Sequence, residues 1–388
     1  MMADTAASPR RSGGRLASID AMRGLVMLLM TLDHVRWDFT AVAQRLWRDA
    51  SVLPANPLEL ETTTPTFFLM RWVTHLCAPT FVFLAGASVN FWMLRHGREL
   101  SVGRYLLTRG AMIVGINMIL GLHAPFSSTR VLVLGVLWAI GCSMLLLALV
   151  VRLPRALSWC LALLLVAGHD AVRGYIPEGE VASVLWRLAF VRTYFEVPGV
   201  GAVYALYTVL PWFGLMWLGY LCGGVFRMEV ERRRRLLPAL GAGCLALFAL
   251  LRLSGGYGDP TSFMAQSTAW RTMASFVNVG KYPPTLQFTL LTLGVMWLLL
   301  AWFERGRRLE LLCVPGRAPL AYYVLHIICI RVLAAVLALM PEPIRGASFS
   351  ALGVVAFSVL MYAALYPVCA WIGLWRAGGY RMSGGAPA

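Results

Sequence analysis

Lysine is almost absent from this sequence, and charged residues of either sign are few. Lys281 is the only lysine among 34 basic residues, 18 residues are acidic, and charged residues make up 13% of the chain against 59% hydrophobic residues. A soluble globule could not cover its surface with so few polar groups. The composition, with a mean hydropathy of +0.70, therefore excludes an ordinary soluble protein and indicates one that crosses a membrane many times.

The cysteines lack the close spacing that a disulfide framework or a zinc site requires. All except Cys313 fall inside apolar stretches, and no metal cofactor is predicted. The eight cysteines stand at positions 77, 142, 160, 222, 244, 313, 329 and 369.

A fixed-period repeat and a linker between domains are also missing, which predicts one domain over residues 18–376. Residues 1–17 and 377–388, rich in Arg, Ser or Gly, are expected to be disordered cytoplasmic tails. The first tail has neither the apolar region nor the cleavage site of a signal peptide, so the first apolar helix is expected to remain as an anchor.

Ten apolar stretches approach the roughly 20 residues that span a bilayer as a helix. They predict an all-α, polytopic membrane helix bundle of about ten transmembrane helices. The stretches cover residues 20–39, 66–94, 105–122, 130–151, 156–172, 201–225, 236–253, 284–303, 318–340 and 348–375.

The distribution of basic residues predicts the orientation of this bundle. With the N-terminus placed inside, nineteen basic residues fall in cytoplasmic segments and nine in outer segments. Loops that stay in the cytoplasm collect Lys and Arg, so both termini are predicted to be cytoplasmic. The net charge of +16 then reflects arginine facing anionic lipid headgroups, and nucleic acid is not an expected partner.

The first stretch, "MRGLVMLLMTLDHVRWDF", is apolar until four ionisable residues occur within six positions. Arg23 and His34 are eleven residues apart, which places them on one helix face about 16 Å apart along the axis. An arginine near the cytoplasmic mouth can bind phosphate, and a deeper histidine can exchange protons near neutral pH. The four ionisable residues are Asp33, His34, Arg36 and Asp38.

This spacing suits an acyl-CoA thioester, whose phosphorylated nucleotide head is joined to a thin arm with the reactive group at its end. His34 would be the general base that activates an acceptor hydroxyl or amine, with Asp33 or Asp38 orienting its ring. The alternative is structural: Arg23 reaches toward headgroups, and ion pairs such as Asp33 with Arg36 or His34 with Asp38 offset the cost of buried charge.

Two further pairs of candidates lie one helical turn apart. His75, four residues after Arg71, is either a second proton-handling residue or a packing histidine. Arg71 and Asp38 are expected on the acceptor side. Tyr322 and His326 follow the cytoplasmic start of the predicted helix 318–340, where contact with the CoA arm or nucleotide is expected.

Two residues at outer helix ends are candidates for acceptor binding. His169 lies near the outer end of the stretch 156–172, and Lys281 precedes "YPP" at the outer start of the stretch 284–303. The alternatives are interfacial placement for His169 and a lipid phosphate as the partner of Lys281.

The segment "SIDAMRGLVMLLMTLDHVRWDF" resembles the first helix of bacterial relatives of the heparan-alpha-glucosaminide N-acetyltransferase catalytic family. The resemblance runs from Arg15 to about residue 375, and Arg23 with His34 also resembles the Arg/His motif of the broader membrane acyltransferase type 3 group. Further similar segments are "RWVTHLCAPTFVFLAG", "VLWAIGCSMLLLAL", "AGHDAV", "LPWFGLMWLGYLCG", "KYPPTLQFTLLTLG" and "GRAPLAYYVLHI".

The resemblance implies a multi-pass enzyme of the bacterial cytoplasmic membrane that takes acetyl-CoA from the cytoplasm. The acetyl group would reach a sugar or other envelope acceptor on the far side, and a homodimer is left open. One departure matters: the lysosomal member, which acts on a terminal glucosamine, has asparagine where His34 stands and a histidine in the following loop. Residues 40–65 here contain no histidine, so that enzyme's acceptor and catalytic assignment do not carry over directly.

Two other classes of protein fit part of the pattern. A proton-coupled transporter of an amphiphilic or anionic metabolite could use the same intramembrane Arg, Asp and His, but paired helix breaks in the two halves are not obvious. A haem-bearing redox protein needs histidines at matching depths, and only His34 with His75 offers such a pair. Acyl transfer is therefore the main prediction.

Overall fold

The structure is a computed structural model, and it describes residues 16–47, 56–96, 101–123, 131–197, 201–306, 309–341 and 350–382. Most of these residues are helical. In chain order the elements are α1 (Ala17–Trp47), α2 (Pro65–Val73), η1 (Thr74–Leu76), α3 (Cys77–His96), α4 (Ser101–Leu120), β1 (Leu122–His123), β2 (Val131–Leu134), α5 (Val136–Val150), α6 (Arg155–Gly168), η2 (His169–Val172), α7 (Glu180–Phe190), β3 (Thr193–Val197), β4 (Gly201–Ala205), α8 (Val209–Cys222), η3 (Val225–Arg227), α9 (Val230–Ser254), α10 (Ala269–Val277), α11 (Leu286–Phe303), α12 (Glu310–Gly316), α13 (Pro319–Ala338) and α15 (Ala351–Met382).

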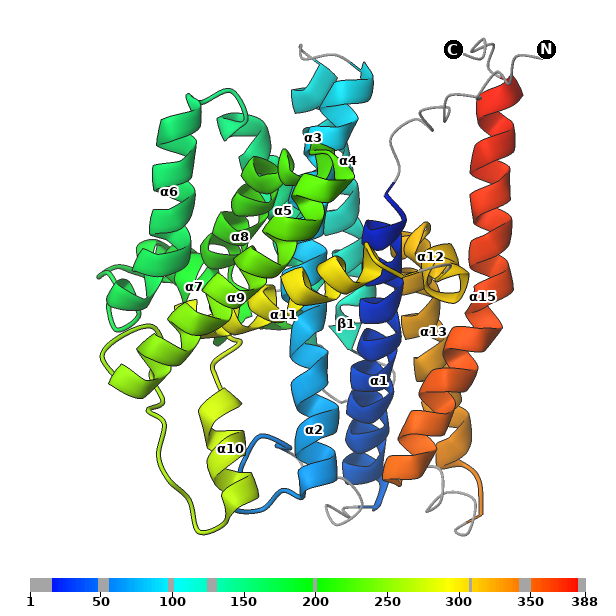
Figure 1. The fold of residues 1–388 in the computed structure, drawn as a ribbon. Helices are drawn as coiled ribbons and strands as arrows, with labels where there is room; N and C mark the ends of the chain where they lie inside the picture. The colour runs from blue at the N-terminus through cyan, green and yellow to red at the C-terminus, as the bar shows by residue number, and fades with distance from the viewer. Residues whose placement is uncertain are drawn as a thin grey trace, which may run out of the picture.

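α1 stands inside the bundle, with α3 and α11 on one side and α12, α13 and α15 on the other (Figure 1). α1 begins and α15 ends at the same end of the bundle, which we call the near end. α2 and α10 lie at the opposite end, which we call the far end.

The chain is a multi-pass helical membrane protein. Within the described residues, seven helices are long and apolar enough to cross a membrane. α1 is not among them because Asp20, Arg23 and Asp33 interrupt its apolar run. The seven are Pro65–Met93, Arg155–Val172, Val209–Arg227, Val230–Ser254, Leu286–Phe303, Pro319–Leu337 and Ala351–Trp375.

The prediction of an all-α fold needs a correction, because a four-stranded sheet has the order β1-β2-β4-β3. β2 and β4 pair in parallel, and the two outer pairs are antiparallel. β2 and β4 occupy the starts of two stretches predicted as continuous helices. Asn117 binds the backbone where β2 leads into α5, since its amide donates to the Val133 carbonyl at 3.1 Å and accepts from Gly135 N at 3.2 Å.

Two short helices also lie between the stretches that were predicted to span the membrane. α7 falls within residues 173–200, and α10 within residues 254–283. Both are amphipathic, since their apolar residues repeat at helical spacing. The Pro and Gly residues around them are typical of loops, so the sequence did not predict these helices.

The predicted tails are only partly covered by the described residues. Residues 1–15 and 383–388 lie outside them. α15 continues to Met382, beyond residue 377, where the second tail was predicted to begin. Helical hydrogen bonding there outweighs the roughly 1 kcal/mol that each glycine costs in a helix.

Close backbone contact joins α1 to α12. A Cβ atom added at Gly24 would lie 1.8 Å from the carbonyl oxygen of Leu312, and one added at Gly316 would lie 1.9 Å from that of Asp20. Helices in a membrane gain little from the hydrophobic effect between them, so close packing at small residues is a main source of their association. The two glycines therefore fix where the chain turns into α13.

α13 then runs beside α1 in the same direction. Thr31 on α1 lies 2.6 Å from the hydroxyl of Tyr322, and one turn further along both helices His34 reaches His326. Thr31 and Tyr322 are both completely buried. The α1–α12 contact thus determines which residues of α13 face the ionisable part of α1.

We expect Gly316→Ala to lower the midpoint of thermal unfolding in detergent, followed by the fluorescence of the 14 tryptophans. The added methyl group would press on the backbone of α1, and overpacking of this kind costs about 1–3 kcal/mol. Gly115→Ala on α4 is the control, because nothing lies within 4 Å of the added atom. Equal midpoints for the two variants would show that the contact does not limit stability.

Candidate active site

Three aromatic rings lie close together between α1 and α13. The ring centres of His34 and His326 are 5.0 Å apart with 11° between the ring planes, and the centre of the Tyr322 ring lies 5.3 Å from that of His326. Tyr323 meets both histidine rings edge-on, at 6.0 Å from His34 and 5.4 Å from His326. His326 is completely buried, whereas His34 is partly exposed.

The hydrogen bonds of His326 determine the tautomer of His34. His326 Nδ1 lies 2.9 Å from the Tyr322 carbonyl oxygen, which can only accept, so this nitrogen carries a hydrogen. In neutral His326, Nε2 then accepts from His34 Nδ1, which is 2.8 Å away. Neutral His34 is left with a lone pair on Nε2, which makes that atom the available base.

This geometry changes two sequence-based assignments. His326 was expected nearer the cytoplasmic side as a CoA contact, but it lies level with His34 because α13 begins inside the bundle beside Gly24. Asp33 was expected to orient the ring of His34, yet the bond to Nδ1 comes from His326. Hydrogen-bond partners between distant helices cannot be read from spacing along one helix.

Asp33 instead joins α1 to α2 through two guanidinium groups. Its Oδ1 accepts from Arg36 at 3.1 Å, and its Oδ2 accepts from Arg71 at 3.2 Å. Arg71 also donates to the hydroxyl of Thr74 at 2.9 Å. The predicted pairing of Asp33 with Arg36 is therefore present, and Arg71 extends it toward the far end.

Arg23 is on α1 close to the near end, and its side chain reaches α3. It donates to the carbonyl of Leu84 at 3.3 Å and to the hydroxyl of Ser88. Its guanidinium is 3.7 Å from Asp20, which is also 3.8 Å from Arg317. Two cations thus flank one carboxylate where α1 begins.

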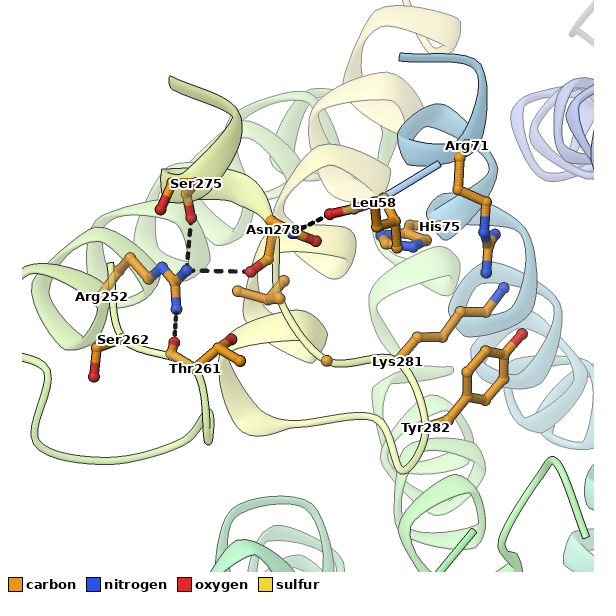
Figure 2. Close-up of a pocket in the computed structure, with 12 residues that line it drawn as sticks. Leu58, Arg71, His75, Arg252, Thr261, Ser262, Ser275, Asn278, Lys281 and Tyr282 are labelled. Carbon is orange, nitrogen blue, oxygen red and sulfur yellow. Dashed lines mark hydrogen bonds between the residues drawn. The ribbon is translucent and has the colours of Figure 1, made fainter. Parts of the chain in front are cut away.

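A cavity of about 240 Å³ lies beside Arg71, toward the far end of the bundle, and we call it the far-end cavity. Arg71, His75, Lys281 and Tyr282 form one part of its wall, and Figure 2 shows the ends of Arg71, Lys281 and Tyr282 directed toward one another. The other lining residues are Leu58, Arg252, Thr261, Ser262, Ser275, Asn278, Val279 and Gly280. Arg23 and His34 do not line it.

Positive charge is in excess in this part of the cavity. Lys281 Nζ lies 5.2 Å from the centre of the Tyr282 ring, and Arg192 lies 5.7 Å from the same ring. Burial raises the pKa of Tyr282, but the positive charges of Lys281 and Arg71 oppose this effect and hold the pKa below its usual value. Tyr282 donates to the hydroxyl of Tyr207 at 3.4 Å.

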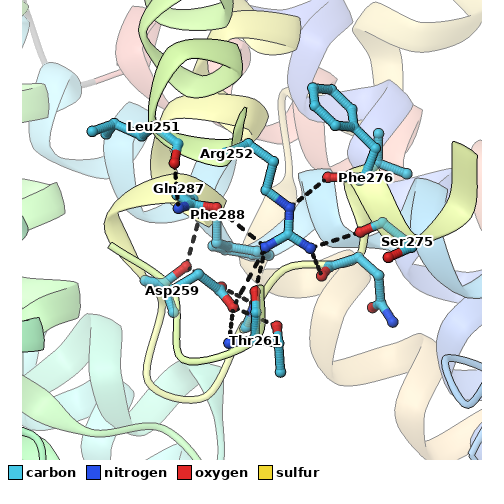
Figure 3. A network of polar contacts seen from close by, with 12 residues as sticks. Leu251, Arg252, Asp259, Thr261, Ser275, Phe276, Gln287 and Phe288 are labelled. Carbon is cyan, nitrogen blue, oxygen red and sulfur yellow. Dashed lines mark hydrogen bonds and ion pairs between the residues drawn. The ribbon is translucent and has the colours of Figure 1, made fainter. Parts of the chain in front are cut away.

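The opposite wall is built around Arg252, at the end of α9 (Figure 3). Its guanidinium donates to four carbonyl oxygens and to the side chain of Gln287 at 3.3 Å, and lies 3.9 Å from Asp259. The carbonyls belong to Thr261, Ser275, Phe276 and Asn278, at 2.5, 2.6, 2.9 and 3.1 Å. Because its donors are occupied in this way, Arg252 holds the segment between α9 and α11 in place rather than facing a ligand.

Two predicted acceptor-side residues do not line the cavity. His169 Nδ1 lies 3.0 Å from the Leu165 carbonyl, and its Nε2 lies 3.5 Å from Asp170. Asp170 in turn accepts from the backbone amide of Leu286 at 2.9 Å, which ties η2 to the start of α11. Asp38 is half-buried on α1, beyond Asp33.

Sequence reasoning missed Tyr282, Tyr323 and Arg252. Tyr323 stands three residues before His326, a spacing that places both on one helix face. Arg252 is an ionisable residue within a predicted span, and such residues default to candidates for a functional or structural role. Tyr282 has no such signal, since only the folded loop turns it toward Arg71.

Comparison with known protein families identifies the family of this chain. The family described as heparan-alpha-glucosaminide N-acetyltransferase, catalytic, matches residues 15–251. The chain belongs to this family. It is therefore a multi-pass membrane protein of an acetyltransferase family, and the match includes His34, Asp33, Arg71 and His75. A comparison with proteins of curated function found no match.

We expect Asp33→Asn to destabilise this family member by about 3 kcal/mol, because it leaves two buried guanidinium groups without their counter-charge. Adding Arg71→Met should recover part of the loss, so the double-mutant cycle in thermal or denaturant unfolding should give a clear coupling energy. Glu231→Gln, which breaks an exposed ion pair with Arg234 at 3.3 Å, is the control and should change little. Additive effects of the two substitutions would show that the Asp33–Arg71 contact is not energetically important.

Proposed function

We propose that this protein transfers an acetyl group from cytoplasmic acetyl-CoA to a sugar or other envelope acceptor on the extracytoplasmic side of the bacterial inner membrane. The observation that carries the proposal is the His34–His326 pair, which leaves one lone pair available as a base inside the bundle. Membership of an acetyltransferase family supports the choice of acetyl as the group transferred.

The proposed orientation places the near end in the cytoplasm. α1 begins and α15 ends there (Figure 1), which is compatible with ten crossings and two cytoplasmic termini. Arg23 then stands about 16 Å along the α1 axis from His34, on the cytoplasmic side. We assign Arg23, with Arg317 beside the same Asp20, to the phosphates of CoA.

The reaction follows from the tautomer of His34. The acceptor hydroxyl or amine attacks the thioester carbonyl carbon while its proton passes to His34 Nε2. The tetrahedral intermediate collapses, the carbon–sulfur bond breaks, and the CoA thiolate takes up a proton. His326 acts as a positioning residue, since it holds His34 Nδ1 and so keeps the base on Nε2.

The residues of the far-end cavity receive the acceptor in this proposal. Arg71, His75 and Lys281 line it, and Arg71 reaches Asp33, the neighbour of His34 in the chain. His75 is the second proton-handling candidate. An acceptor held there would approach the reaction centre from the side opposite to CoA.

The donor assignment predicts that Arg23→Ala weakens acetyl-CoA binding by about tenfold or more, the loss of one or two charge-assisted hydrogen bonds. The measurement is calorimetric titration of acetyl-CoA into detergent-purified protein. Arg104→Ala on α4 is the control and should bind as the wild type does. If folded wild-type protein does not bind acetyl-CoA, the donor assignment is wrong and the proton-coupled transporter becomes the better reading.

The base assignment predicts that His34→Gln lowers acetyl transfer at least roughly 100-fold while acetyl-CoA affinity stays unchanged. CoA released in the presence of a panel of amino sugars and other sugars would be separated by chromatography, which avoids thiol reagents that react with the protein's own cysteines.

His326→Leu should also lower kcat and alter the pH profile, because His34 loses the acceptor that fixes its tautomer. His326→Gln, whose amide oxygen can accept the same hydrogen bond, should restore part of the rate. If both His326 variants are equally impaired and the pH profile does not change, His326 is only a packing residue.

A further inference from the structure

We infer that the far-end cavity binds an oxyanion, a carboxylate or phosphate group, carried by the acceptor and held by Lys281. This inference rests on the proposed function, because it names the chemistry of the molecule that would receive the acetyl group. It narrows the acceptor from sugars in general to molecules that are negatively charged close to the position of transfer.

Lys281 is a buried cation without a counter-charge in the part of the chain that the structure describes. It is only 6% exposed, and no carboxylate of the described residues lies within ion-pair distance of its amine. Lysine is rarely buried without a partner, because desolvating an ammonium group costs several kcal/mol unless an anion compensates. A bound oxyanion would supply this compensation.

The nearby carboxylate of Asp33 is already occupied. It is shared by Arg36 and Arg71 at 3.1 and 3.2 Å, and it does not lie within ion-pair distance of Lys281. Lys281 adds a further positive charge on the cavity side of this group. The balance of charge at the wall therefore favours a ligand with one or two negative charges over a neutral one.

His75 supplies the second observation that points to a ligand. Its side chain is 2% exposed, and neither ring nitrogen has a hydrogen-bond partner among the described residues. The ring meets Phe288 edge-on at 5.4 Å and lines the same cavity as Lys281. Buried polar groups are nearly always satisfied, so a ligand oxygen that accepts from His75 would complete the site.

The size and rigidity of the cavity fit a small charged group. A volume of about 240 Å³ corresponds to roughly eight water molecules at about 30 Å³ each, enough for a carboxylate or phosphate and part of its sugar. The backbone before Lys281 is fixed, since Asp259 accepts from Gly280 N at 2.7 Å and from Thr285 at 2.9 Å. A cation fixed in advance binds its anion with less loss of entropy.

The cavity is also close to the reaction centre. Arg71, which lines it, donates at 3.2 Å to Asp33, the residue before His34 on α1. An acceptor anchored at Lys281 by its oxyanion would direct a neighbouring hydroxyl or amine toward His34. The anchor would thus determine which position of the acceptor is acetylated.

The test measures binding of D-glucuronate, inorganic phosphate and the neutral methyl ester of D-glucuronate to purified protein in nanodiscs of phosphatidylcholine. We expect titration calorimetry to show binding of the two anions and none of the ester. Lys281→Met should weaken anion binding by about tenfold or more, and Lys281→Arg should retain most of it.

Arg271→Met is the matched control, because it removes one positive charge from α10 without altering the cavity lining. Arg271 donates to the Glu61 carbonyl at 3.2 Å and is not among the lining residues. Unchanged anion affinity in this variant would support a specific site. An equal loss in both variants, or equal binding of the ester and the acid, would overturn the inference.

The single lysine allows a direct readout. Acetylation of Lys281 by a water-soluble amine reagent, followed by mass spectrometry of its peptide, should slow when glucuronate or phosphate is present and not when the ester is. Repeating the experiment in nanodiscs with phosphatidylglycerol distinguishes a lipid headgroup: if that lipid protects Lys281 and neither free anion displaces it, the site binds lipid and the acceptor assignment is wrong.

Acetyl-CoA titration of the same preparations separates this inference from the proposed function. Lys281→Met should bind acetyl-CoA as the wild type does. Donor binding without anion binding would overturn the inference alone, whereas loss of donor binding in the folded wild type would overturn the proposed function.

Discussion

The carboxylate of Asp33 lies between the guanidinium groups of Arg36 and Arg71, and the arrangement of the site depends on this contact. It offsets the desolvation of three ionised groups inside an apolar bundle, where each alone would be costly. It also joins α1, which carries His34, to α2, which carries Arg71 and leads to His75. A base and a cationic cavity are thereby held in one rigid unit, although they come from different helices.

Close helix packing provides the second constraint. Gly24 and Gly316 let the backbones of α1 and α12 touch, and this fixes the position from which α13 starts. His326 then arrives level with His34, and its own bond to the Tyr322 carbonyl leaves it only one role toward that ring, as an acceptor. The protonation pattern of the candidate base is thus a consequence of how two backbones pack several turns away.

The segment between α9 and α11, which carries Lys281, shows how a polar segment can be made rigid next to a membrane. Arg252 binds four carbonyl oxygens of the loop, and Asp259 binds the backbone just before Lys281 (Figure 3). The only lysine of the chain is therefore carried by a segment that these side-chain hydrogen bonds hold in place. The ammonium group of Lys281, by contrast, has no carboxylate within ion-pair distance among the described residues.

The sequence by itself determined the class of the protein and most of its helices. The length of each apolar stretch and the positions of the arginines are local properties of the chain, and a bilayer responds to them directly. The sequence also identified the ionisable residues of α1 as candidates for the site, since charged side chains in an apolar stretch are visible without a structure. It could not place His326 against His34, assign Arg71 to Asp33, or reveal the sheet, because each depends on which segments meet in space. Tertiary packing alone decided these contacts: residues about 290 positions apart become neighbours only when two backbones approach at glycine, and the hydrogen bonds formed there settle which nitrogen can act as the base.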